Sequence, residues 1–258
     1  MKKTVYLVAA ASALLSLAGC QLNKQTPDYS KIYANAIVTV KHTPEDVFYL
    51  QLDDKTTVKP SNMDESPFGD KQVRALANLT VSDEKPEQGN SSVAFDKTAV
   101  VNWIDSVRTK DMVPSLGSEA EDDHEYGDAP IDIIGNWVTI LEDGYLTLAF
   151  CAYWGNPAAV HAVNLVSGVD PEDPYTLEFK HNAFDDNWYY NPITATGIVA
   201  FDLSSLPPTN GETVELKIKY KPIYGSESVA KFKYCTGKTT ETGAVPDPAK
   251  LTKSLNIL

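Results

Sequence analysis

The stretch Val214-Glu-Leu-Lys-Ile-Lys-Tyr220 alternates apolar and charged side chains without a break. Successive side chains of a β-strand point to opposite faces of a sheet, so this period of two predicts a strand with one buried face and one wet face. The same period recurs along most of the 258 residues, and long segments with a helical period are absent. The chain is therefore predicted to be all-β.

The second half of the chain contains about seven segments of this kind, separated by turn-forming residues. They span residues 137–141, 145–153, 159–166, 176–181, 198–203, 213–220 and 229–234. Glu142-Asp143-Gly144 predicts a hairpin turn, because glycine adopts positive φ without steric cost. Seven short strands with turns between them predict an antiparallel β-sandwich over residues 131–240, followed by a C-terminal tail at 241–258.

The first half has the same period in four segments, at residues 36–40, 47–52, 73–81 and 98–107. Four or five strands in about 80 residues is the size of a small barrel, which we expect at residues 33–116. Between the halves, residues 119–128 carry six carboxylates in ten positions, which is typical of a solvated linker, assigned to 117–130. A cation site there is the alternative, but the alternating ligands and bend glycine of a calcium loop are missing among Asp122, Asp123, His124 and Asp128.

The N-terminus has the features of an export signal. Lys2 and Lys3 precede an apolar run at residues 5–17, which is shorter than the roughly 20 residues of a membrane span. The sequence Leu17-Ala-Gly-Cys20 resembles the lipobox of bacterial lipoproteins, in which the cysteine receives the acyl chains. We expect a lipoprotein signal peptide at 1–19, lipidation of Cys20 and a tether at 20–32. The alternative is an ordinary secretory signal.

The charge of the chain restricts its partners. The formal net charge is −13, and it becomes −15 when Lys2 and Lys3 leave with the signal peptide. Nucleic acid and anionic lipid would be repelled by such a surface. An envelope location permits a disulfide between Cys151 and Cys235, and two buried free thiols are the alternative.

The motifs of common enzymes are absent from the sequence: it has no G-x-S-x-G, P-loop, H-E-x-x-H or C-x-x-C. His181 shares the apolar face of Leu177 and Phe179, so we interpret it as a packed structural residue. A hydrolase or metal-dependent site would require His161, His181 and Asp185 to converge in space. We therefore predict no catalytic residue, no metal and no cofactor.

Aromatic residues are the better functional candidates. Trp188, Tyr189 and Tyr190 follow one another in a polar segment, and Trp154 precedes Gly-Asn-Pro in a similar context. Large rigid rings on polar loops suit contact with a partner or a sugar, and the alternative is that they fold back over the end of the sandwich. Asp105-Ser106-Val107 resembles a short bacterial O-glycosylation acceptor, which makes Ser106 a candidate modification site.

Several ordered segments resemble the NigD-like lipoprotein family. The residues that carry this resemblance span 100–110, 134–148, 161–166, 177–183 and 201–206, in an otherwise undistinguished chain. The resemblance implies an N-terminal OB-type barrel, a C-terminal β-sandwich and an envelope lipoprotein. It carries no established activity or catalytic residue, and its link to bacteriocins is one of name only.

These observations predict a non-enzymatic, lipid-anchored protein of the outer membrane that acts as a binding or accessory module. Its expected partner is an envelope protein, an exported peptide or a glycan. A glycan-binding surface lipoprotein, a structural subunit of a surface assembly and a metal-dependent hydrolase are the alternatives. The segment after Cys20 has no acidic residue up to Thr26, which favours the periplasmic face.

Overall fold

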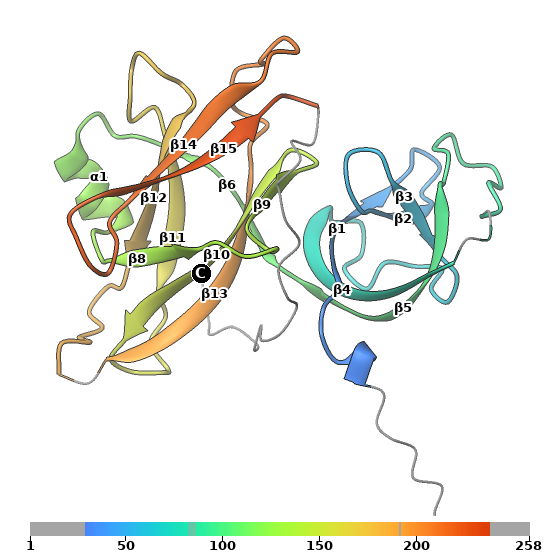
Figure 1. The fold of residues 1–258 in the computed structure, drawn as a ribbon, viewed down its shortest axis with the longest axis horizontal. Helices are drawn as coiled ribbons and strands as arrows, with labels where there is room; N and C mark the ends of the chain where they lie inside the picture. Colours follow the sequence, from blue (N-terminus) through green and yellow to red (C-terminus); the bar gives the residue numbers. More distant parts are fainter. Residues whose placement is uncertain (1–28, 83, 85, 191, 238–258) are drawn as a thin grey trace, which may run out of the picture.

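The computed structural model describes residues 29–82, 84, 86–190 and 192–237. Lipidation of Cys20, the signal peptide and the tail at 241–258 fall outside these residues and stay predictions. Within them, the regular secondary structure is mostly β-strand, with one short 3-10 helix, η1 (Tyr29–Lys31), and one α-helix, α1 (Glu119–Tyr126) (Figure 1). The predicted all-β class is therefore confirmed. No helix among the described residues is long and apolar enough to cross a membrane.

The first domain is a closed five-stranded barrel with strand order β1-β2-β3-β5-β4. Its apolar interior is formed by inward-facing residues such as Val38, Val40 and Leu50, each fully buried. β3 and β5 run parallel and the other pairs are antiparallel. The strands are β1 (Ala36–His42), β2 (Phe48–Gln51), β3 (Thr57–Pro60), β4 (Val73–Ser82) and β5 (Lys97–Ser106).

The second domain is a sandwich of two five-stranded sheets. One sheet has the order β6-β13-β10-β8 with β9 also paired to β10, and the other has the order β15-β14-β12-β11-β7. The first sheet contains β6 (Arg108–Asp111), β8 (Ile131–Ile134), β9 (Ile140–Glu142), β10 (Tyr145–Trp154) and β13 (Ile193–Asp202). The second contains β7 (Val113–Pro114), β11 (Ala162–Ser167), β12 (Thr176–Asn182), β14 (Val214–Tyr220) and β15 (Ser228–Tyr234).

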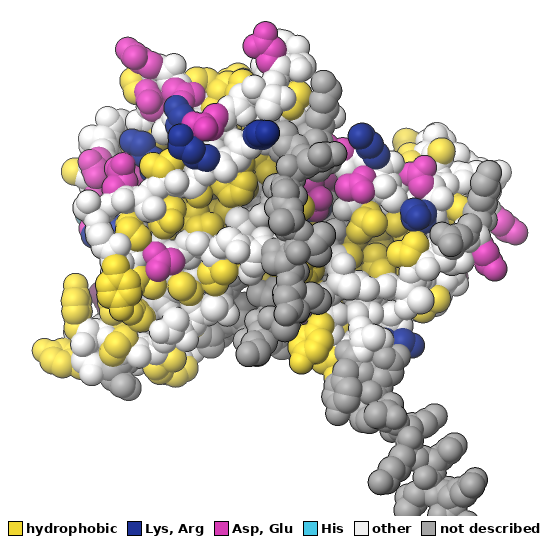
Figure 2. Space-filling view, viewed as in Figure 1, with side chains coloured by type: hydrophobic (Ala, Val, Ile, Leu, Met, Phe, Trp, Pro, Cys, Tyr) yellow, Lys and Arg dark blue, Asp and Glu magenta, His cyan; other side chains and the backbone are white. Residues whose placement is uncertain are grey.

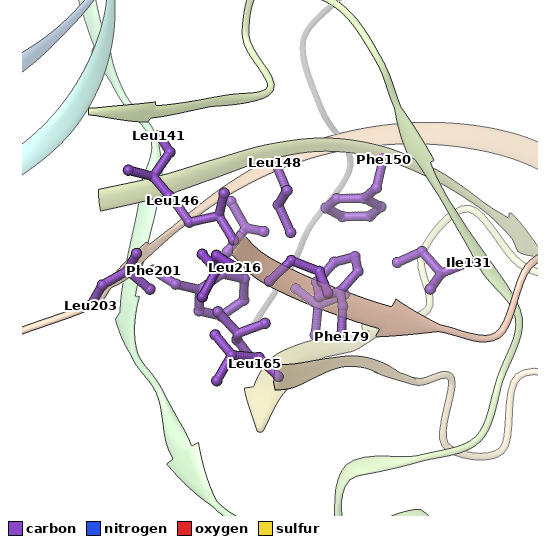
Figure 3. Packing of buried hydrophobic residues seen from close by; sticks show 14 of the residues in the cluster. Ile131, Leu141, Leu146, Leu148, Phe150, Leu165, Phe179, Phe201, Leu203 and Leu216 are labelled. Carbon is purple, nitrogen blue, oxygen red and sulfur yellow. The ribbon is translucent and has the colours of Figure 1, made fainter. Parts of the chain in front are cut away.

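The sandwich core lies between the two sheets and is filled by large apolar side chains (Figure 3). Phe150 from β10 and Phe179 from β12 meet edge to face, with ring centroids 5.8 Å apart. Phe179 makes the same kind of contact with Phe201 of β13 at 6.0 Å. Edge-to-face pairs add to the burial of the rings, so these contacts help to hold the two sheets together.

The boundary between the domains differs from the expected one. β6 pairs with β13 and β7 pairs with β11, both in parallel, so the chain joins the sandwich at Arg108 rather than at residue 131. The segment predicted to be an acidic linker contains α1 instead. Ser118 caps this helix by accepting a hydrogen bond from the backbone N–H of Glu121, and carboxylates in the first turn complement the helix dipole. The linker prediction was therefore wrong.

The disulfide that the sequence permits between Cys151 and Cys235 is not formed. Cys151 lies in β10 and Cys235 follows β15, and both are free thiols. The two cysteines belong to opposite sheets of the sandwich. Cys235 is buried, and its sulfur lies 3.6 Å from the Thr209 hydroxyl, which donates to it. These residues are two separate packed thiols.

The barrel and the sandwich meet at the β9–β10 hairpin. Arg74 of β4 is fully buried and forms a 2.6 Å ion pair with Glu142, while its other terminal nitrogen donates to Thr39 at 2.9 Å. Lys41 pairs with Asp143 at 2.6 Å. Next to these charges, the apolar residues Ile37, Val138 and Ala149 are buried across the same contact. We call this region the joint.

Candidate functional site

The loop between β12 and β13 presents aromatic rings to solvent at one end of the sandwich. Tyr189 is 81% exposed, Tyr190 is 92% exposed and Phe184 is 59% exposed. Figure 1 shows this loop at the lower left, and Figure 2 shows hydrophobic side chains gathered on the same end of the molecule. We call Phe184, Trp188, Tyr189 and Tyr190 the aromatic tip.

The aromatic tip has a defined local structure. The rings of Trp188 and Tyr189 stack with centroids 5.5 Å apart and an interplanar angle of 18°. The Asn187 side chain accepts a hydrogen bond from the backbone N–H of Tyr189, and Asn182 accepts one from Phe184 in the same way. Such asparagine turns fix the backbone locally. The rings are therefore displayed by an ordered loop.

Asp186 attaches this loop to the end of β10. Its two carboxylate oxygens accept hydrogen bonds from the backbone N–H groups of Gly155 at 2.7 Å and Asn156 at 3.0 Å. The approach is so close that a Cβ at Gly155 would lie 2.2 Å from the Asn187 carbonyl oxygen. Glycine is therefore required at this position by contact between two backbones.

Beneath Asp186 lies a row of hydrogen bonds between buried side chains, which we call the histidine ladder. Asp186 Oδ2 is 3.0 Å from His161 Nε2, and His161 Nδ1 is 2.8 Å from His181 Nε2. His181 Nδ1 is 3.1 Å from the carbonyl oxygen of Pro130. Both imidazoles are buried, and the Asp186 side chain is 6% exposed. The ladder thus joins the loop to β11, β12 and the segment before β8.

The partners of the ladder determine its protons. A carbonyl oxygen only accepts, so His181 donates from Nδ1 to Pro130 and its Nε2 accepts from Nδ1 of His161. His161 Nε2 then faces a carboxylate oxygen, and this contact is a hydrogen bond only with a further proton between the two. Three bonds need three protons, whereas two neutral imidazoles supply two. All three contacts are hydrogen bonds only when both ring nitrogens of His161 carry a proton.

The surroundings act on the pKa values of the two histidines. Burial lowers the pKa of His181 to about 4, helped by the neighbouring His161, while the backbone carbonyls of Pro130 and Ala129 oppose this shift. Burial also lowers the pKa of His161, and the Asp186 carboxylate opposes it. His181 is therefore neutral at pH 7.

Trp154 lies inside this cluster rather than on the surface. Its side chain is 1% exposed and stacks on His161 with centroids 4.1 Å apart and an interplanar angle of 7°. The prediction that Trp154 contacts a partner was therefore wrong, because its ring covers the ladder. The indole N–H is buried without a hydrogen-bond partner among the described residues.

The histidine ladder has little in common with a hydrolytic or metal site. Histidine and carboxylate do converge, but through Asp186 and not through Asp185, which is exposed. No group of three or more metal-binding side chains suited to an ion occurs in the described part of the chain. The ladder ends on a backbone carbonyl and is closed to solvent, so its arrangement favours structural support of the aromatic tip.

Ser106 is the last residue of β5 and is exposed, as is Asp105 beside it. The side chain is thus accessible to a modifying enzyme, and its glycosylation stays a prediction. His181 is buried on the face of Leu177 and Phe179, as its position in the alternation indicated. Sequence reasoning missed Asp186 as the anchor and Phe184 as part of the tip. Period-two alternation places neither of them, because both lie outside a strand.

The fold defines a class of protein, a small barrel joined to a β-sandwich. Residues 37–107 match the NigD-like N-terminal OB domain, and residues 112–234 match the NigD-like C-terminal β-sandwich domain. The chain belongs to the NigD-like family. No protein of curated function matches it.

Solved structures agree with this assignment. A protein from Parabacteroides distasonis, described as toxin-related, is 35% identical over 78% of this chain and 92% of its own, with a TM-score of 0.60. A protein of unknown function from Bacteroides vulgatus is 22% identical over 84% of this chain and 98% of its own (TM-score 0.63). A NigD-like immunity protein from Bacteroides caccae is 18% identical over 78% of this chain and 96% of its own, with a TM-score of 0.53. The last two likenesses show the shared fold.

Proposed function

We propose that this chain is a lipid-anchored, non-enzymatic protein of the cell envelope that acts by binding, with the aromatic tip as its contact surface. The observation that carries the proposal is the pairing of exposed rings with a buried polar support. An ordered loop loses little conformational entropy on contact, and tryptophan and tyrosine are enriched among the few residues that dominate binding at protein interfaces. The component contacted belongs to the envelope in which the lipid on Cys20 holds the chain.

A non-enzymatic role is supported by the geometry of the titratable groups. All four ring nitrogens of His161 and His181 are engaged: one from each ring contacts the other ring, and the remaining two contact Asp186 and Pro130. A general base needs a free nitrogen within hydrogen-bond reach of a substrate. Neither buried imidazole offers one.

The anchor is tested by replacing Cys20. Wild-type protein is expected in the outer-membrane fraction and the Cys20→Ala variant in a soluble fraction, because the acyl chains supply the membrane affinity. Equal membrane recovery of both proteins would overturn the anchor. Proteolysis of intact cells then decides the side of the membrane, since protection of the chain until lysis is expected for the periplasmic face.

The contact surface is tested by photocrosslinking in cells. A benzophenone amino acid in place of Tyr189 is expected to capture an envelope component that the same group at Val100 does not capture. Val100 is an exposed apolar residue of the barrel, so it is a matched control. Equal capture from both positions would contradict a specific role for the tip.

A glycan is the second candidate for the captured component. The stacked Trp188 and Tyr189 rings offer a flat aromatic surface, and Asn187 and Asp185 beside them are exposed. Binding of labelled envelope glycans by the wild-type chain, lost in Trp188→Ala, would favour this candidate.

A further inference from the structure

We propose that the aromatic tip rests in the interfacial layer of the same membrane to which the chain is tethered. This inference depends on the proposed lipid anchor, and it names the bilayer surface as the envelope component that the tip contacts. Three features of the molecule support the inference: the side on which the described chain begins, the side chains that the tip exposes, and the positions of the charges.

The described chain begins on the side of the molecule toward which the tip projects. Figure 1 shows η1 at the lower side of the barrel and the β12–β13 loop at the lower end of the sandwich. The chain from Cys20 to Tyr29 reaches at most about 30 Å, since an extended residue spans about 3.3–3.6 Å. A lipid on Cys20 therefore keeps this side of the protein near the bilayer surface.

The tip has the composition of a membrane-interface contact. Tyrosine and tryptophan are enriched at membrane interfaces, because the apolar body of the ring lies among lipid while its polar group stays in water. Residues 184–190 contain four aromatic residues and two carboxylates, and of the two carboxylates Asp186 is buried in the histidine ladder. Its burial removes one negative charge from the surface that would meet the headgroups.

A second exposed apolar site lies where the chain enters the barrel. Ile32 is 55% exposed and Tyr33 is 48% exposed, directly after η1. Together with the tip, these residues give two apolar contacts, one next to η1 on the barrel and one on the sandwich. Two separated contacts fix the tilt of a protein on a plane, which one flexible tether does not do.

The charge distribution is compatible with this orientation. On the face shown in Figure 2, most acidic side chains lie along the upper edge and over the barrel, away from the lower left end. The net charge of −13 would repel an anionic surface, so we expect the tip to prefer zwitterionic lipid. The acyl chains supply the affinity, and the tip supplies the orientation.

Brominated lipids test the inference with the native protein. The lipidated chain is reconstituted into phosphatidylcholine–phosphatidylethanolamine vesicles, with bromine placed on the acyl chains close to the headgroup. Bromine quenches tryptophan fluorescence only at short range. The fluorescence that Trp188→Phe removes is the contribution of Trp188. We expect the brominated lipid to quench at least a third of this contribution in the wild-type protein. The Trp188→Phe variant should lose that quenching.

Trp137→Phe is the matched control, because Trp137 is half-buried and packs against the apolar residues of the joint. This variant is expected to keep the quenching. Equal quenching in wild type and Trp188→Phe would overturn membrane contact by the tip. Capture of a protein or glycan from position 189 in cells, without lipid adducts, would also overturn it while supporting the proposed binding function. Failure of the chain to reconstitute would contradict the lipid anchor itself.

Discussion

The two ends of β10 bury polar groups in opposite ways. At the joint, Tyr145 receives a hydrogen bond from Gln72 of the barrel, and Glu142 beside it is paired with the buried Arg74. At the other end, Trp154 covers a ladder that is satisfied within the sandwich, and the rings beyond it are exposed. The polar groups of the joint bond to a second domain, so the joint is a permanent interface. The tip keeps its polar groups inside and leaves apolar surface available for contact.

Breaking the joint should have the largest effect. Arg74→Met leaves Glu142 buried with no cation, at a site where burial already raises the pKa of Glu142 and Arg74 opposes that rise. We expect the free energy of unfolding to fall by about 3 to 5 kcal/mol in denaturant titrations. The double variant Arg74→Met/Glu142→Leu should recover most of this loss, since no charge is left unpaired. A single variant as stable as wild type would show that the ion pair contributes little.

Asp186→Ala should have the next largest effect. It leaves two backbone N–H groups and His161 without their acceptor in a buried site, which should cost about 3 kcal/mol of unfolding free energy. Faster hydrogen exchange is expected at residues 184–190. The control is Asp185→Ala, an exposed neighbour, which should change stability by less than about 0.5 kcal/mol. Equal effects of the two variants would argue against the ladder as the support of the tip.

Acidification should weaken the tip end more than the joint. The pKa of His181 is about 4 in the folded protein and 6.5 for an ordinary histidine, so the unfolded chain binds more protons between these limits. Its contribution to stability is complete above about pH 6.5 and is lost as the pH falls toward 4. Between pH 7 and 5 this amounts to about 2 kcal/mol. Between pH 7 and 5, the free energy of unfolding of His181→Gln should fall by about 2 kcal/mol less than that of the wild type. The same pH dependence in both proteins would refute the role of His181 in acid destabilisation.

Changing the tip surface should have the smallest effect on stability. Tyr189→Ser/Tyr190→Ser removes two exposed rings and should shift the free energy of unfolding by less than about 0.5 kcal/mol. The same variant should lose crosslinking in cells and contact with vesicles. Comparison with the loss of stability in Arg74→Met then distinguishes the tip, whose surface serves contact, from the joint, whose surface serves folding. A large loss of stability would mean that the rings pack against the sandwich.

Alternation along the chain was sufficient to predict the class and most strands, because strands such as β14 have one buried and one exposed face. It failed where pairing is decided by distant residues. Arg108–Asp111 is polar on both faces and becomes β6 only by lying beside β13. The acidic segment at Glu119–Tyr126 forms a helix because Asp123 pairs with Lys180 from β12, and the buried Asp122 accepts from Ser115 and Leu116.

The site was predicted only in part for a similar reason. The aromatic run was visible in the sequence, but its support depends on His161 and His181, which are twenty residues apart, meeting through a register that the sequence does not specify. Which of Asp185 and Asp186 anchors the loop also depends on the three-dimensional structure. Only the second carboxylate reaches Gly155, where the missing side chain lets the two loops touch.

The pairing of β10 with β13 over ten residues also has a mechanical consequence. The joint lies at one end of this pair and the aromatic tip at the other, about 30 Å away at roughly 3.3 Å per residue. A pull on the tip, resisted by the tethered barrel, acts along the strand axes. The hydrogen bonds between the two strands then share the load together instead of opening one after another. The two strands thus form a rigid connection between the anchored barrel and the surface that the aromatic tip contacts.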